Sequence, residues 1–199
     1  MRAVLVFLLF PALAFGGSGE VTPFLAWHGG GELETSLGNR PDLEGRDAWG
    51  LTVTFDRGPG KKLDVLFSRQ EAALLVEDLF RPPDNIRVSV DIEYLQVGGR
   101  YLFEPEARVR PYIGGTIGVT RFSAEEGGSD VRFSGAFGGG VDVGISDRVA
   151  FRLDGRWYVT LVDANAELTC AGGDCVGFAG GSGFGQLALS GGLVFSFGP

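Results

Sequence analysis

Residues 149–161 alternate strictly between two kinds of side chain. The odd positions from Val149 to Leu161 are apolar apart from Gly155, whereas the even positions are small or polar and include Arg152 and Asp154. Successive side chains of a β-strand point to opposite faces of its sheet, so this segment forms a strand with one apolar and one polar face. The same period of two recurs along most of the chain, which predicts an all-β protein.

The alternation predicts a single set of strands joined by connections of two kinds. Short turns at 57–60, 104–107 and 146–148 alternate with long polar segments. A water-soluble sandwich would not usually gather all of its long loops at one end, whereas transmembrane β-barrels do. We therefore predict an all-β, transmembrane, eight-stranded antiparallel up-and-down β-barrel with both termini on the short-turn side. The expected strands are 24–35, 48–56, 62–76, 86–103, 108–122, 131–145, 149–161 and 186–197.

The segment 86–103 changes phase along its length. Val88, Val90 and Ile92 share one face, whereas Leu95 and Val97 lie on the other. Either a bulge intervenes, or the upper part of the strand stands above the bilayer, where no lipid requires an apolar outer face. A spanning strand needs only about 9–11 residues, which favours a projecting hairpin. Such a hairpin would place Phe67 opposite Leu95 and Arg69 opposite Glu93.

The N-terminus has the pattern of a secretory signal peptide. Arg2 precedes an apolar run over residues 3–10, and small residues suited to cleavage follow. The run is too short for a transmembrane helix, which needs roughly 20 apolar residues. We therefore expect a signal peptide at 1–19 and one barrel domain at 20–199. The formal net charge of -8 and the absence of Lys and Arg clusters argue against nucleic acid as a partner.

Two features resemble a known family. The C-terminal strand, with Ser190, Gly192, Phe195 and Phe197, resembles the signal by which bacterial outer-membrane barrels reach the barrel assembly machinery; Gly198 and Pro199 follow it. The segments 111–118, 138–143 and 152–158 look like strands of the small OmpA/OmpX/OmpW-type barrel family. The resemblance implies a monomer in the outer membrane that contacts outer-membrane lipids and lipopolysaccharide. It concerns strands, and it carries over no functional residue.

The inward face of the expected barrel is charged. An eight-stranded barrel is about wide enough for its own side chains to fill it, so these charges would pair and plug the lumen. A narrow ion pathway is the alternative. We expect charge pairs centred on Arg152, Asp154 and Arg156. The two arginines would pair with acids on other strands, such as Asp142 on the neighbouring strand and Asp64 across the lumen. The candidate network consists of Glu32, Lys62, Asp64, Arg100, Arg110, Asp142, Arg152, Asp154 and Arg156.

His28 is the only histidine. Barrel acyltransferases and lipid A deacylases use a histidine with a serine or an acid, which makes His28 with Glu32 a candidate pair. Both would point into the lumen, away from any lipid substrate, so we interpret His28 as a structural residue and expect no catalytic site. One histidine and no clustered thiols also predict no metal site and no cofactor.

Cys170 and Cys175 lie in the longest loop, separated by four residues. In a secreted chain two cysteines indicate a disulfide, and the flanking glycines allow tight closure. A metal or redox site is the alternative, although the loop offers no other ligands.

These observations predict a non-enzymatic outer-membrane barrel with a structural or surface-interaction role. The long loops are acidic overall, which fits either a solvated rim or a surface that holds divalent cations against lipopolysaccharide phosphates. The alternative function is an OmpW-like narrow channel for small or hydrophobic molecules. That channel would need an apolar lumen near its outer mouth, whereas the expected lumen is charged.

Overall fold

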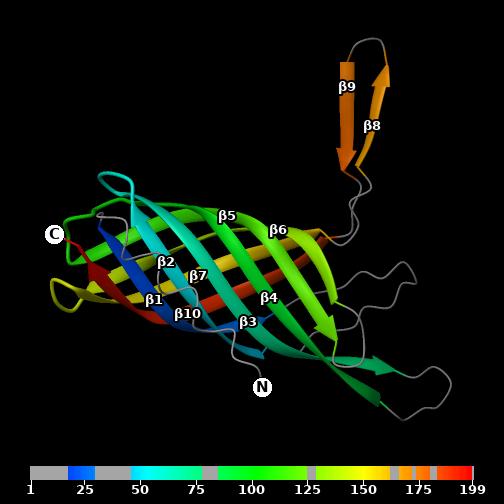
Figure 1. Cartoon of the computed structure of the whole chain (residues 1–199), viewed down its shortest axis with the longest axis horizontal. Helices are drawn as coiled ribbons and strands as arrows, with labels where there is room; N and C mark the ends of the chain where they lie inside the picture. Colours follow the sequence, from blue (N-terminus) through cyan, green and yellow to red (C-terminus); the bar gives the residue numbers. More distant parts are fainter. Residues whose placement is uncertain are drawn as a thin grey trace.

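The computed structural model describes residues 18–29, 46–77, 85–124, 129–161, 166–171, 174–179 and 183–198, with side chains left out at 46, 72–90, 124, 166–171, 174–179 and 183–184. These residues form ten strands, of which eight close into a barrel and two form a separate hairpin (Figure 1). The barrel strands are β1 (Gly19–Gly29), β2 (Arg46–Asp56), β3 (Lys61–Glu77), β4 (Asn85–Leu102), β5 (Val109–Ala124), β6 (Ser129–Gly144), β7 (Val149–Leu161) and β10 (Gly183–Phe197).

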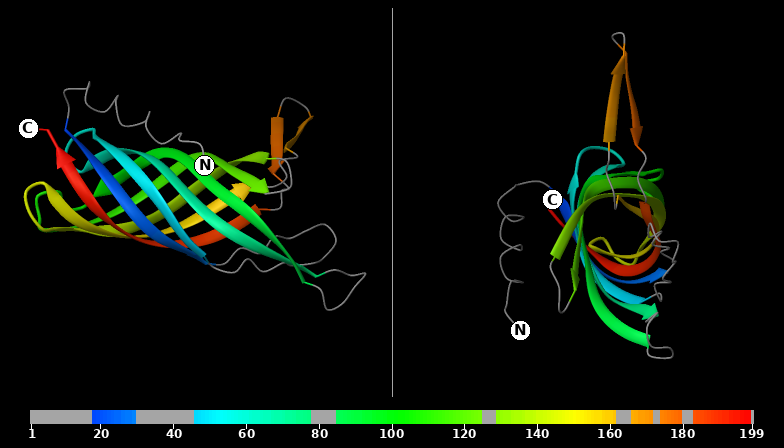
Figure 2. Two further views of the ribbon diagram at one scale, coloured as in Figure 1. Left: turned by 60° about the horizontal axis from the view of Figure 1, so that its bottom comes forward. Right: turned by 90° about the vertical axis from the view of Figure 1, so that its right-hand side faces the viewer.

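Every strand of the barrel pairs antiparallel with its neighbours. β1 pairs with β2 on one side and with β10 on the other, which closes the sheet on itself. The end-on view in Figure 2 shows the resulting ring. Closure leaves no strand edge unpaired between the first and last strands, as a barrel in lipid requires.

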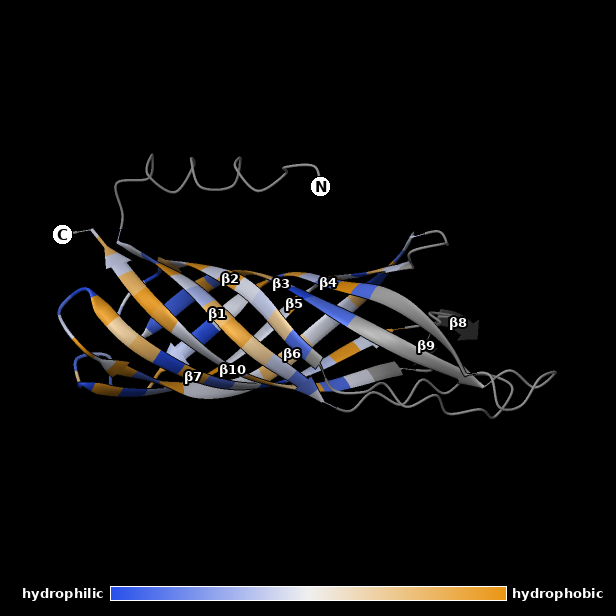
Figure 3. Ribbon diagram, turned by 90° about the horizontal axis from the view of Figure 1, so that it is seen from below, coloured by the Kyte–Doolittle hydropathy of each residue, from blue (hydrophilic) through white to orange (hydrophobic). Residues whose placement is uncertain are grey.

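The two faces of the wall have opposite character. Outward side chains are apolar and exposed in the isolated chain, for example Leu25 at 73% and Ile117 at 60%, whereas inward ones such as Thr54 and Asp142 are fully buried. Figure 3 shows that hydrophobic and hydrophilic residues are interspersed along the barrel strands. The outward apolar side chains are buried only if hydrocarbon surrounds them, so the predicted transmembrane barrel is confirmed. The described residues contain no helix with the length and apolarity needed to cross a membrane.

The first strand differs from its prediction. β1 begins at Gly19 rather than at residue 24 and ends at Gly29, and residues 30–35 lie outside the description. Pro23 suggests a boundary because proline lacks an N–H, but the pairing of β1 with β10 skips positions 22 and 23. The register is the same on both sides of this gap, so the missing proline N–H interrupts the ladder locally without ending the strand. The longer start brings Glu20 and Thr22 into the lumen wall.

The register of β3 against β4 runs unbroken from Lys61 opposite Tyr101 to Glu77 opposite Asn85. Phe67 lies opposite Leu95 and Arg69 opposite Glu93, as predicted, and the described ladder contains no bulge. Ile92 is buried in the lumen at 1% exposure, whereas Leu95 is exposed outside at 51%. The phase change therefore reflects a change of surroundings, and the hairpin projects beyond the barrel (Figure 1).

The longest expected loop contains structure that the sequence analysis did not predict. β8 (Ala166–Ala171) and β9 (Asp174–Ala179) form a two-stranded hairpin. Its register places Cys170 directly opposite Cys175. Their side chains lie outside the description, so the disulfide stays a prediction.

Candidate functional site in the barrel lumen

Three cations converge on one buried carboxylate near the end of the lumen where the termini lie. Glu20 of β1 pairs with Lys62 of β3, with Arg100 Nη2 of β4 at 2.7 Å, and with Arg152 Nη2 of β7 at 3.3 Å. The Glu20 side chain is 4% exposed. Burial of an unpaired carboxylate would cost several kcal/mol, so these contacts hold the charge in place and tie four strands together across the lumen.

Each of the two arginines is held by a second acid on a neighbouring strand. Arg152 donates two hydrogen bonds to Asp142, from Nε to Oδ1 at 2.6 Å and from Nη2 to Oδ2 at 2.8 Å. Arg100 Nε lies 3.5 Å from Asp64 Oδ2, and Thr54 donates to the other Asp64 oxygen at 2.7 Å. The two charge-assisted bonds between Arg152 and Asp142 fix the geometry of that pair, whereas Arg100 and Asp64 form an ion pair without a hydrogen bond.

Tyr112 joins this network to the next pair of charges. Its hydroxyl donates to Asp154 Oδ2 at 2.6 Å, and Arg156 Nε donates to Asp154 Oδ1 at 2.6 Å. The guanidinium carbons of Arg100 and Arg152 lie 5.3 and 5.5 Å from the centre of the Tyr112 ring, within cation–π range. The Tyr112 ring therefore lies close to both guanidinium groups, while its hydroxyl links them to the pair of Asp154 with Arg156.

Most of the charged lumen residues predicted from the sequence meet in this network. The expected partners were wrong in two cases: Asp64 contacts Arg100 on the adjacent strand rather than across the lumen, and Arg156 contacts Asp154 on its own strand. Arg110 lies opposite Asp142 in register, but its buried Nε has no hydrogen-bond partner among the described residues. Glu32 lies outside the described residues.

Glu20 is the central residue that sequence reasoning missed. The prediction placed it after the signal peptide and before the first strand. The signal was present, because Glu20 and Thr22 continue the inward phase of Ala26 and His28. The predicted start of the strand at residue 24 excluded it.

The half of the described lumen farther from the termini contains aromatic rings among uncharged polar side chains such as Gln70 and Gln186. His28 stacks on Tyr158 with ring centroids 5.6 Å apart, and Tyr94 lies 4.6 Å from Tyr158. The Tyr94 hydroxyl donates to Gln186 Oε1 at 2.7 Å. The buried charge pairs therefore lie in the half nearer the termini, whereas the outer half contributes only the part-exposed pair of Arg132 with Asp130 at the rim of β6 among the described residues.

Little space remains between the charged and the aromatic half. One cavity of about 20 Å³ is lined by Phe24, Leu66, Tyr158 and the Asp154–Arg156 pair, which is room for roughly one water molecule. Beside it, the buried Nδ1 of His28 has no hydrogen-bond partner among the described residues. An ordered water is the chemical group that such a polar nitrogen and such a cavity accommodate.

The remaining predicted residues do not assemble into a reactive centre in the part of the chain that the structure describes. No group of three or more His, Cys, Asp or Glu side chains that could hold a metal ion occurs there. Ser190 and Gly192 face the lumen cavity, whereas Phe195 and Phe197 are exposed on the outside at 43% and 37%. Their role as an assembly signal stays a prediction.

A scan against protein-family models finds no match, and a search of curated proteins likewise finds none. Solved structures do match. Neisserial surface protein A is 14% identical, covering 92% of this chain and 97% of that chain with a TM-score of 0.59. Outer membrane protein W of E. coli is 17% identical, covering 92% and 98% with a TM-score of 0.56. OprG of Pseudomonas aeruginosa is 10% identical, covering 92% and 97%, also at 0.56. The chain therefore has the fold of the small eight-stranded outer-membrane barrels.

Proposed function

We propose that this chain is a non-conducting outer-membrane barrel with a structural or surface-interaction role. The observation that carries the proposal is the closure of the lumen around Glu20, where side chains from β1, β3, β4 and β7 meet. A passage through the barrel would have to break these pairs. Breaking one buried pair costs about 3–5 kcal/mol, so an ion finds no open path.

The charges of the plug balance. The half of the described lumen nearer the termini holds five acids and five bases, namely Glu20, Asp56, Asp64, Asp142 and Asp154 with Lys62, Arg100, Arg110, Arg152 and Arg156. A lumen with equal numbers of both signs in contact has no excess charge to attract a permeating ion. Balance of this kind favours a plug over a selective pore, whose lining usually carries an excess of one sign.

The outer-membrane location and the orientation rest on the apolar outer face, the signal peptide and the fold. In this orientation both termini and the short turns face the periplasm. A cysteine introduced at Gly58, in the exposed turn between β2 and β3, should resist membrane-impermeant thiol reagents in intact cells. A cysteine at position 81, in the second long loop, should react. Reaction at position 58 in intact cells would invert the orientation.

The absence of enzymatic activity is part of the same proposal. His28 is buried at 1% exposure against two tyrosine rings inside the lumen. A nucleophile or base that acts on a lipid must reach the lipid-facing side of the wall. The position of His28 therefore supports a structural role.

Single-channel recording of the purified protein in planar bilayers tests the plug. We expect no steady conductance from the wild type. A large, stable wild-type conductance that Asp154→Ala leaves unchanged would reject the plug, because that substitution removes the partner of Arg156 and Tyr112.

A second function, a narrow channel for small or hydrophobic molecules, is favoured by one observation. Above the charge network the described lumen contains the rings of His28, Tyr94 and Tyr158 together with uncharged polar side chains. The cavity beside Leu66 holds only about one water molecule, so this function requires the rings to move apart. An apolar fluorophore would then bind in this half, and Leu66→Trp would reduce its binding. Binding that Leu66→Trp leaves unaltered would remove this candidate.

A further inference from the structure

Four charged side chains interrupt the apolar outer face of the barrel at one place. Arg69 of β3, Asp91 and Glu93 of β4, and Arg121 of β5 all occupy outward positions on adjacent strands. We call these four residues the outward charged cluster. On β6 and β7 the outward positions at the same end, such as Val131 and Leu161, remain apolar and exposed. The charges are therefore local to one sector of the wall.

The contacts within the cluster leave one guanidinium largely unused. Arg69 Nη2 lies 2.6 Å from Asp91 Oδ2, while its Nη1 lies 3.6 Å from Glu93 Oε1. Arg121 Nη1 lies 3.6 Å from the other oxygen of Glu93, and the Arg121 side chain is 52% exposed. A separation of 3.6 Å is too long for a hydrogen bond. Arg121 thus makes one loose ion pair within the described residues and presents its donors outward.

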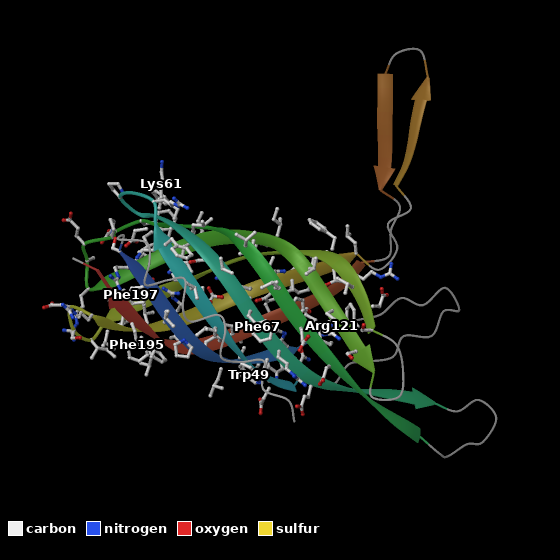
Figure 4. All side chains as sticks on the ribbon, viewed as in Figure 1. Trp49, Lys61, Phe67, Arg121, Phe195 and Phe197 are labelled. Atoms are coloured by element: carbon white, nitrogen blue, oxygen red, sulfur yellow. The ribbon has the colours of Figure 1, made fainter. Side chains whose placement is uncertain are left out.

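The cluster borders one of the aromatic girdles of the barrel, the rings of outward aromatic side chains at its two ends. Arg69 is the register partner of Trp49, whose ring meets that of Phe67 edge-on at 5.8 Å. Toward the membrane centre the neighbouring outward row is apolar and contains Phe67 and Leu95. Figure 4 shows Trp49, Phe67 and Arg121 toward one end of the barrel, and Lys61, Phe195 and Phe197 toward the other.

This position determines what the cluster meets. An arginine on the lipid face costs about 2–4 kcal/mol at the bilayer midplane but only about 0–1 near the interface. A row of charges directly beyond Trp49 and Phe67 therefore lies at the level of the lipid headgroups, which are its closest neighbours outside the protein. The nearby outward carboxylate of Glu71 is exposed and makes no ion pair among the described residues.

We propose that the outward charged cluster binds the phosphorylated headgroup of an outer-leaflet glycolipid together with its divalent counter-ion. Arg121 and Arg69 supply planar guanidinium groups, which suit phosphate oxygens. Asp91 and Glu93 balance the two arginines, and the exposed, outward Glu71 and Asp47 lie on the adjacent strands, so a bare phosphate gains little here. A phosphate that carries Mg²⁺ or Ca²⁺ suits both the arginines and the carboxylates of the cluster, because carboxylate oxygens are the ligands these cations prefer.

The proposal rests on the orientation in the proposed function, with the long loops outside. The chain supplies a matched control for it, since Lys61 is likewise outward and exposed but lies at the opposite girdle, next to Tyr101 in register. Arg121→Ala and Lys61→Ala each remove one exposed cation from the outer face. They differ in the leaflet that they face.

The experiment measures the binding of bisphosphorylated and dephosphorylated lipid A to the full barrel in phosphatidylcholine nanodiscs, by native mass spectrometry. Loss of a charge-assisted contact corresponds to a drop in affinity of about tenfold or more. We expect that drop for Arg121→Ala with bisphosphorylated lipid A, no change for Lys61→Ala, and weaker wild-type binding after chelation of divalent cations by EDTA. Dephosphorylated lipid A should bind wild type and Arg121→Ala equally weakly.

Several outcomes would overturn the proposal. Equal binding of the two lipids by the wild type would show that phosphate is not recognised, and an equal effect of both substitutions would show nothing specific to Arg121. Wild-type binding that EDTA leaves unchanged would show that no divalent cation takes part. Retention of the unheated, compact gel mobility shows that each variant folds. Failure of the plug is scored separately by conductance, which Arg121→Ala should leave at the wild-type level because Arg121 faces away from the lumen.

Discussion

Glu20→Ala tests the lumen network at its centre. The substitution removes the carboxylate that three cations share and leaves a buried excess of positive charge. Breaking a buried pair costs about 3–5 kcal/mol. We expect Glu20→Ala to lower the free energy of unfolding by about 3 kcal/mol, the lower end of this range, because each of the three cations retains another acid as a partner. These second partners are Asp142 for Arg152, Asp64 for Arg100 and Asp56 for Lys62.

Urea titration of the protein in lipid vesicles, followed by tryptophan fluorescence, measures the effect. With a slope of about 1–3 kcal/mol per molar urea, the midpoint should fall by about 1–3 M. Glu104→Gln, in the exposed turn before β5, is the control and should change the free energy of unfolding by less than about 0.5 kcal/mol. A loss below about 1 kcal/mol for Glu20→Ala, with conductance still absent, would refute the claim that Glu20 holds the plug together.

Three further predictions concern the wall and the β8–β9 hairpin. Leu153→Arg puts a charge on the lipid face, where Leu153 is 50% exposed, and should cost about 2–4 kcal/mol by vesicle refolding; Ala150→Ser in the lumen should cost less than about 1, and equal effects would reverse the assigned faces. Gly98→Ala places a Cβ 2.1 Å from the carbonyl oxygen of Gly115, whereas Gly99→Ala meets nothing closer than 3.4 Å; the first should cost about 1–3 kcal/mol and the second little, and equal urea midpoints would contradict this packing. Reduction of the Cys170 to Cys175 disulfide should leave the urea midpoint of the barrel unchanged, because the loop it closes is short; two free thiols in denatured, unreduced protein would show that no bond forms.

The strand faces could be predicted because alternation is a local signal. Each inward or outward assignment depends on immediate neighbours, as Trp157 and Tyr158 show on opposite sides of β7. The register of β3 against β4 was also predicted, because the alignment of Phe67 with Leu95 keeps the apolar outer rows together and places Arg69 opposite Glu93.

The pairing of lumen charges could not be predicted in the same way. Contacts such as Glu20 with Arg100 span 80 positions in the chain and depend on barrel closure and stagger. The stagger sets which inward residues share a level, and alternation carries no information about it. The same holds for the separation of the lumen into a charged half and an aromatic half, because His28, Tyr94 and Tyr158 come from three strands and meet only after closure.

The phase change in β4 and the outward charged cluster have one physical cause. The backbone register continues through Ile92 and Leu95 without interruption, so the sheet itself does not change there. The surroundings change: beside Leu95 the outside is hydrocarbon, whereas beside Glu93 it is the headgroup layer, where charge is tolerated. Beyond that level the outer face no longer has to be apolar, while the inner face, with Ile92 buried at 1%, still packs. The position at which alternation reverses therefore marks the edge of the membrane on this side of the barrel, and Arg69, Glu93 and Arg121 lie on that edge.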